Sequence, residues 1–181
     1  MRVFIAIPLP VDIRASLASL CHGIAGAKWT QPENMHITLR FLGELNDEQC
    51  RDLDDELSEI NCPRFDLTFR SFGCFDKRGH VHTLWAALDK SPELERLFEK
   101  VESASVRAGL EKARRKFKPH TTLARFRHVE DREIGTFMES RNPYSSEPFP
   151  AQSFVMYQSL RGNEGPRYEV LAEYPLISYS E

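Results

Sequence analysis

Residues 36–43 read HITLRFLG, a stretch in which polar and apolar side chains alternate. Alternation with a period of two predicts a β-strand with one face in the core and the other face outside it. The opening of this stretch recurs in residues 120–126, which read HTTLARF. His-x-Thr-Leu followed by an arginine and a phenylalanine therefore occurs twice. The repeat predicts two strands that play the same part in two lobes facing each other.

Helix and strand patterns surround both stretches. Strands are expected over 2–8, 36–42, 65–75, 81–88, 120–126, 153–160 and 168–177, from runs rich in β-branched and aromatic residues. Helices are expected over 11–24 and 131–139. Two more are expected to begin after N-caps at Asn46 and at Ser91, where Pro92 follows the cap. Strands joined by hairpins and helices in this order predict an α+β fold with antiparallel sheets.

The composition is that of a globular chain with a substantial core, because 41% of the 181 residues are hydrophobic. This length suits one domain, or one domain built as two lobes. Lys and Arg number 24 against 27 Asp and Glu, which gives a net charge of -3. The balance argues against a protein that coats nucleic acid by charge, but it leaves room for a local site that holds one phosphate group.

The start of the chain and the cysteines predict a cytoplasmic protein. No apolar run approaches the ~20 residues of a membrane span, and the N-terminus reads as a first strand rather than a signal peptide. Four cysteines are widely spaced and form no C-x-x-C pair, so neither a zinc knuckle nor a redox motif is indicated. Reduced thiols are therefore expected.

The two motifs carry side chains suited to acid–base chemistry. Strict alternation places His36, Thr38 and Arg40 on one face of the first strand. It places His120 and Thr122 on one face of the second strand. Arg125 then lies on the other face, unless a bulge turns it. One imidazole can give a proton while another accepts one near pH 7, and hydroxyls can donate to phosphoryl oxygens. This set fits hydrolysis of a phosphodiester, and residue chemistry alone leaves open which histidine is the acid.

The motif pair resembles the paired H-x-T-x motifs of the two-histidine phosphoesterases. Similarity is greatest to the bacterial and archaeal RNA 2′,3′-cyclic phosphodiesterases, also called the 2′-5′ RNA ligase family. The segments that carry the resemblance are RVFIAIPLP (2–10), NMHITLRFLGEL (34–45), FKPHTTLARF (117–126) and SLRGNEGPRYEVL (159–171), in the same order and spacing. They cover nearly the whole chain.

The resemblance implies a bilobal α+β domain over residues 1–181, with two antiparallel β-sheets and flanking helices in a pseudo-twofold arrangement around a central cleft. It implies metal-independent and cofactor-free hydrolysis of a 2′,3′-cyclic phosphate at an RNA end, which yields a 2′-phosphate. His36 is then the proton donor to the departing 3′ oxygen, His120 is the proton acceptor that activates water, and Thr38 and Thr122 hold the phosphate. The family is also linked to the reverse reaction, which makes 2′-5′ linkages.

Several other residues are candidates for substrate contacts. Arg40, Arg125, His82 and Tyr168 are the substrate-binding candidates, and for Arg40 the alternative is a solvated surface residue. Phe41, Phe126 and Tyr168 are candidates for stacking on a base, although the two phenylalanines fit the core better. The basic run Arg114, Arg115, Lys116 and Lys118 is either a solvated loop or a strip that steers RNA towards His120.

Three other functions stay open at this point. The same four motif residues would serve an enzyme for another cyclic phosphate, such as ADP-ribose 1″,2″-cyclic phosphate. A non-catalytic module that binds RNA ends would keep the fold, but binding alone requires no acid and base. A metal-dependent phosphodiesterase would use His80 and His82, although no third ligand is marked nearby. The expected partner is RNA with a cyclic phosphate terminus, tRNA fragments included, and the expected state is a monomer.

Overall fold

The computed structural model describes residues 1–163 and 165–178 and confirms the predicted α+β fold class. The described strands are β1 (Arg2–Pro8), β2 (Lys28–Trp29), β3 (His36–Glu44), β4 (Phe65–Leu67), β5 (Phe69–Lys77), β6 (His80–Leu88), β7 (His120–Arg125), β8 (Phe149–Ala151), β9 (Ser153–Gly162) and β10 (Gly165–Pro175). The described helices are α1 (Val11–Ser19), the 3-10 helix η1 (Pro32–Asn34), α2 (Asp47–Ser58), α3 (Pro92–Arg107) and α4 (Asp131–Arg141).

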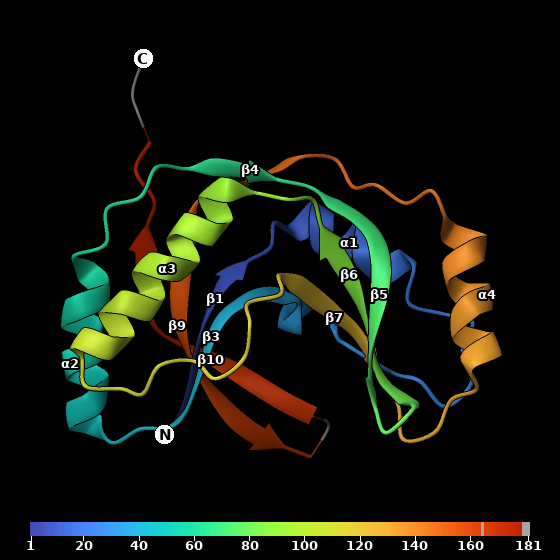
Figure 1. Ribbon diagram of the computed structural model, residues 1–181, viewed down its shortest axis with the longest axis horizontal. Helices are drawn as coiled ribbons and strands as arrows, with labels where there is room; N and C mark the ends of the chain where they lie inside the picture. The colour runs from blue at the N-terminus through green and yellow to red at the C-terminus, as the bar shows by residue number, and fades with distance from the viewer. Residues whose placement is uncertain (164, 179–181) are drawn as a thin grey trace.

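Two four-stranded antiparallel sheets form the centre of the molecule (Figure 1). One sheet, which we call sheet A, has the strand order β10-β9-β1-β3, and the other, sheet B, has the order β2-β7-β6-β5. The short strands β4 and β8 pair with each other. Helices α2 and α3 lie together beside sheet A, and α4 lies at the opposite side of the molecule (Figure 1). The two sheets therefore provide one motif strand each, β3 and β7.

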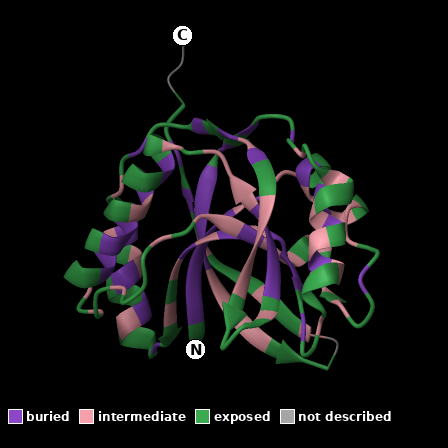
Figure 2. Cartoon of the chain, turned by 45° about the vertical axis from the view of Figure 1, so that its right-hand side comes forward, coloured by how far each residue is buried: buried purple, intermediate pink, exposed green. Residues whose placement is uncertain are grey.

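A single hydrophobic core connects the two sheets. It includes Ile5 and Ile37 from sheet A and Leu84 and Leu123 from sheet B, all fully buried. Figure 2 shows the buried residues along the central strands and the exposed residues on the outer sides of the helices. Among the described residues, no helix is long and apolar enough to cross a membrane.

The predicted helix starts at Asn46 and Ser91 are confirmed. The Asn46 side chain accepts a hydrogen bond of 2.8 Å from the Gln49 N–H, and the Gln49 side chain accepts one of 3.0 Å from the Asn46 N–H. This reciprocal capping box satisfies two N–H groups that the first turn of α2 leaves free. Ser91 Oγ accepts from the Leu94 N–H at 3.1 Å and caps α3, with Pro92 as the first helical residue.

Three predicted elements differ from the structure by more than one or two residues at an end. Helix α1 ends at Ser19 rather than 24, because the following N–H groups bond three residues back and the chain turns. The strand predicted over 65–75 is two strands, since β4 pairs with β8 whereas β5 pairs with β6 in sheet B. The terminal hairpin is longer than predicted, and residue 164 of its predicted turn lies outside the described residues.

A β-bulge follows the first motif. Ala6 pairs with Thr38, but Ile5 pairs with Arg40, so Leu39 is an extra residue in β3. Directly paired residues point to the same side of a sheet, and an extra residue shifts the alternation by one. Thr38 consequently shares a face with His36, whereas Arg40 shares the opposite face with the core residue Ile5.

A second β-bulge follows the second motif at the equivalent position. Trp85 pairs with Thr122, but Leu84 pairs with Ala124, so Leu123 is the extra residue in β7. Arg125 then pairs with a residue of β6 that lies two positions from Trp85 and thus on the same face. The bulge therefore turns Arg125 to the face that carries Thr122.

Candidate active site

The two motif histidines begin neighbouring strands of different sheets. His36 is the first residue of β3 and His120 is the first residue of β7. The Thr121 hydroxyl donates a hydrogen bond of 2.9 Å to the backbone carbonyl of His36 and so ties the strands together. Thr121 is only 1% exposed. The fold thus brings the two motifs side by side, and Thr121, the middle residue of the second motif, is the link between them.

Aromatic rings surround His36. The centroid of its imidazole lies 4.9 Å from that of Phe4, 5.3 Å from that of Tyr168, which stands edge-on, and 6.3 Å from that of Tyr157. Burial among these rings lowers the pKa of His36 to about 4, against a smaller rise from a hydrogen bond to the Asn34 carbonyl. The nearby charge of His120 also lowers this pKa. His36 is therefore neutral at pH 7 in the free protein.

His120 has a similar but more cationic environment. Its ring centroid lies 5.1 Å from that of Phe75, which stands edge-on, and 5.5 Å from that of Trp85. Burial lowers the pKa of His120, a hydrogen bond to the Lys118 carbonyl raises it, and the charges of Arg125 and Lys118 lower it further. His120 Nδ1 lies 2.6 Å from that carbonyl oxygen. Because a carbonyl can only accept, Nδ1 carries the proton and Nε2 of the neutral ring is free to take one up.

Both histidines bond to the backbone carbonyl two residues before them, Asn34 for His36 and Lys118 for His120. In each motif, the hydroxyl two residues after the histidine lies on the same face, which we call the histidine face. Thr38 and Thr122 are both half-buried there. The two motifs thus provide the same local arrangement twice, and two hydroxyls accompany two imidazoles.

The face predicted for Arg125 by strict alternation is wrong, because the bulge turns it to the histidine face. Its charge lowers the pKa of His120 in its own sheet. Burial raises the pKa of the Tyr168 phenol in sheet A, and the charges of Arg125 and Arg2 oppose that rise. Arg125 therefore acts electrostatically on side chains of both sheets.

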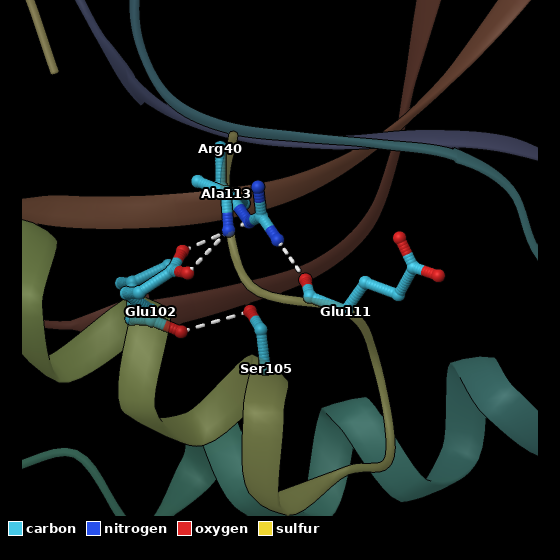
Figure 3. Close-up of polar contacts among 6 residues, drawn as sticks. Arg40, Glu102, Ser105, Glu111 and Ala113 are labelled. Carbon is cyan, nitrogen blue, oxygen red and sulfur yellow. Dashed lines mark hydrogen bonds and ion pairs between the residues drawn. The ribbon is translucent and has the colours of Figure 1, made fainter. Parts of the chain in front are cut away.

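The face predicted for Arg40 is also wrong, again because of the bulge. Its Nε lies 3.0 Å from Glu102 Oε2 of α3, and its Nη2 donates to the Glu111 carbonyl (Figure 3). The side chains of Arg40 and Glu102 are only 12% and 11% exposed. The Ala113 N–H donates to Glu102 Oε1 at 2.6 Å. Arg40 is thus engaged with α3 and the segment after it, on the side of β3 away from His36.

The three stacking candidates divide between surface and core. Tyr168 stands edge-on to His36 and lies at the site as predicted. Phe126 is buried, which confirms its assignment to the core. Phe41 is 68% exposed, so its assignment to the core is wrong. It pairs with Phe4 and therefore lies on the histidine face, where the bulge puts it in place of Arg40.

His82 lies next to the histidine face. Its Nδ1 is 2.7 Å from the Thr83 hydroxyl, and Thr83 pairs with Arg125. Its candidate partner in a metal site, His80, is exposed in the same strand. Across residues 1–163 and 165–178, no group of three or more His, Cys, Asp or Glu side chains is placed to hold a metal ion.

Two further residues of the site have only weak sequence signals. Lys118 Nζ lies 5.0 Å from the ring centroid of Trp85 and 5.5 Å from that of Phe75, which puts its charge over the rings that surround His120. Trp85 in turn lies against Gly73, where an added Cβ would come within 2.2 Å of the indole. A basic residue before the motif and a glycine inside a strand are the only hints in the sequence.

Comparisons with known proteins agree with this arrangement. A family model described as LigT-like phosphoesterase matches residues 7–85 and 87–168, one segment for each motif. An RNA 2′,3′-cyclic phosphodiesterase of Archaeoglobus fulgidus is 30% identical over 177 residues, which cover 94% of this chain and 98% of that protein. One of Bacillus subtilis is 29% identical over 180 residues, covering 96% and 95%.

Solved structures share the fold over the same length. The structure called TT0787 of Thermus thermophilus matches with a TM-score of 0.80 and 25% identity, covering 97% of this chain and 98% of that chain. Escherichia coli LigT complexed with 3′-AMP matches with a TM-score of 0.78 and 26% identity, covering 98% of both chains. Both similarities span the two sheets and therefore include both motif strands.

Proposed function

The chain belongs to the LigT-like phosphoesterase family, and from this premise we propose that it hydrolyses the 2′,3′-cyclic phosphate at an RNA end to a 2′-phosphate with His36 as acid and His120 as base. The relatives named above as RNA 2′,3′-cyclic phosphodiesterases support the substrate class. The structure of LigT with 3′-AMP supports a nucleotide as the occupant of such a site.

The observation that carries the proposal is the hydrogen bond from His120 Nδ1 to the Lys118 carbonyl. It leaves Nε2 of a neutral imidazole free, and the lowered pKa of His120 keeps that nitrogen unprotonated at pH 7. A neutral imidazole with one nitrogen locked as donor is suited to remove a proton from water. The water oxygen then forms a bond to phosphorus.

His36 provides the proton for the other side of the reaction. Its pKa is about 4 because burial disfavours the charged ring. A phosphodiester carries a negative charge, and its arrival beside the ring favours the imidazolium, so substrate binding brings a proton to His36. As the bond from phosphorus to the 3′ oxygen breaks, His36 gives that proton to the oxygen. The cycle leaves His36 neutral and His120 protonated. His120 then releases its proton to bulk water, which restores the starting state.

The remaining polar groups of the histidine face hold the phosphate. Thr38 and Thr122 donate hydrogen bonds to its non-bridging oxygens, and Arg125 balances the charge that builds up in the transition state. These hydroxyls and the guanidinium have no competing charged partner in the described residues, whereas Arg40 is paired with Glu102. The mechanism uses no metal ion, and with a 5′-hydroxyl in place of water as the nucleophile the same groups would join RNA ends through a 2′-5′ linkage.

Aromatic rings on the histidine face of sheet A suit the base of the terminal nucleotide. Phe41 and Tyr168 lie on the same face of sheet A, and Phe41 has most of its surface free. Stacking of a base on an aromatic ring contributes about 1–3 kcal/mol and tolerates any base. We therefore expect weak base preference at this position.

The test is hydrolysis of an oligoribonucleotide that ends in a 2′,3′-cyclic phosphate, with EDTA present. Wild type should form the 2′-phosphate, and His36→Ala and His120→Ala should each slow the reaction by about 10²–10⁴-fold. Thermal unfolding of each variant controls for misfolding. Activity that survives loss of either histidine, or a 3′-phosphate product, would contradict the proposed roles. Turnover of ADP-ribose 1″,2″-cyclic phosphate but not RNA would contradict the substrate.

A further inference from the structure

The segment between α3 and β7, residues 109–118, concentrates positive charge next to the site. It reads GLEKARRKFK and contains five basic residues and one acidic residue, in a chain whose net charge is -3. All five basic residues, Lys112, Arg114, Arg115, Lys116 and Lys118, are exposed. We call this segment the basic arm. Its charge contrasts with the acidic balance of the whole chain.

The basic arm is attached at both ends. Near its start, Arg40 holds the Glu111 carbonyl and Glu102 holds the Ala113 N–H (Figure 3). Near its end, Phe117 stacks on Phe98 with ring centroids 4.2 Å apart and nearly parallel planes. Arg114, Arg115 and Lys116 lie between these attachments, and only Arg114 makes an ion pair among the described residues, an exposed one with Glu111.

The attachments also fix where the arm leads. Its start is held on the face of β3 that contacts α3, by the side chain of Arg40. Its end is on the histidine face, because Lys118 lies over Trp85 and its carbonyl binds His120. The arm therefore passes from one side of β3 to the other, and the three cations belong to the stretch that joins these two sides.

We propose that the basic arm binds the phosphates of single-stranded RNA on the 5′ side of the terminal cyclic phosphate, an inference that rests on the proposed function. A 3′-terminal cyclic phosphate leaves the RNA chain only one direction in which to continue, and that direction needs cations beyond the reacting phosphate. An exposed cluster held at both ends loses little conformational freedom when it binds a polyanion. The preferred substrate is then an oligonucleotide rather than a mononucleotide.

The test compares two substrates and two triple variants. The arm variant is Arg114→Gln/Arg115→Gln/Lys116→Gln. The control variant removes the same charge from the outer helices, through Arg51→Gln/Arg96→Gln/Lys100→Gln. The substrates are uridine 2′,3′-cyclic phosphate and an oligoribonucleotide that ends in the same group. The arm variant should lose about tenfold or more in kcat/KM for the oligonucleotide and keep its activity on the mononucleotide, which also shows that it is folded.

Salt dependence gives a second readout. Three phosphate contacts on a single strand give a slope of about -2 in log kcat/KM against log salt, so wild type should lose about twentyfold more than the arm variant between 50 and 200 mM salt. An arm variant that matches the control variant on both substrates would overturn the proposal. An equal loss of kcat/KM on both substrates would also overturn the proposal, because the arm would then support the site rather than bind RNA.

A binding measurement distinguishes failure of this proposal from failure of the proposed function. If wild type hydrolyses neither substrate, the proposed function fails, and fluorescence anisotropy with an oligoribonucleotide that ends in a 3′-phosphate still tests the arm. Wild type should bind this probe in a salt-dependent way, and the arm variant should bind about tenfold more weakly. Equal affinity of wild type and the arm variant for the probe would reject the arm whatever the catalytic result.

Discussion

The Thr121 hydroxyl donates to the backbone carbonyl of His36 across the boundary between the two sheets. The donor is the middle residue of one motif and the acceptor is the first residue of the other. Because Thr121 is buried, water does not replace this bond when it is lost. This hydroxyl therefore helps to fix the relative placement of the two imidazoles, although it faces away from the proposed phosphate position.

We expect Thr121→Val to reduce both stability and activity. Valine keeps the shape of threonine but leaves the His36 carbonyl without this donor, which costs about 1–3 kcal/mol of unfolding free energy. Urea unfolding measures that loss, and steady-state kinetics should show a lower kcat. Thr121→Ser keeps a hydroxyl and should recover most of the activity. A valine variant as active as the serine variant would show that the bond does not position the motifs.

The lowered pKa of His36 predicts acid-sensitive stability. Its pKa is about 4 in the folded protein and about 6.5 in the unfolded chain, so the unfolded state binds more protons between these values. Stability should therefore be unaffected by this group above pH 6.5 and decline as pH falls towards 4, by about 3 kcal/mol in all.

Urea unfolding of wild type and His36→Gln at pH 7, 5.5 and 4.5 measures this effect. His120 titrates in both proteins, so the difference between them isolates His36. The glutamine variant should lose less stability on acidification than wild type. Parallel curves would mean that His36 is not buried as the structure describes.

Gly73→Ala should disturb the His120 side of the site. The added Cβ would come within 2.2 Å of the Trp85 indole, so the ring must move. Because Lys118 and His120 lie against this ring, their side chains should shift as well. Overpacking of this kind costs about 1–3 kcal/mol. Unfolding free energy, tryptophan fluorescence and kcat should all change. Gly135→Ala is the control, because a Cβ there meets nothing within 4 Å.

Variants of Arg40 decide between its two suggested roles. Arg40→Met leaves Glu102 as an unpaired buried carboxylate, which typically costs about 3–5 kcal/mol. The double variant Arg40→Met/Glu102→Leu removes both charges and should be more stable than Arg40→Met alone. Urea unfolding of the three proteins measures this. An Arg40→Met protein of normal stability but raised KM would instead favour the phosphate contact expected from alternation.

Alternation predicted the site up to Thr38 and Thr122 and failed one residue later in both strands. The bulges at Leu39 and Leu123 add a residue that the hydrophobic pattern does not reveal, since each leucine is buried like the residue two positions before it. The two copies also differ in spacing, because Arg40 follows its leucine directly and Arg125 follows one residue later. With equal bulges, that one residue sends the arginines to opposite faces.

Other parts of the site depend on contacts between distant segments. Thr121 pairs with a carbonyl of another sheet, and Gly73 makes room for a tryptophan from a neighbouring strand. No local pattern encodes either relation, because the partner comes from a different part of the chain. The capped starts of α2 and α3 were predictable, since each cap is complete within four residues.

The hydrogen bond from each histidine to the carbonyl two residues before it makes the orientation of each ring a property of its own strand. A rigid shift of one sheet against the other would change the gap between the rings but not the tautomer of either. The two rings are still coupled through charge, because the charge of His120 lowers the pKa of His36. The proposed mechanism would thus use one local arrangement for two opposite proton-transfer roles, which the surroundings of each ring distinguish.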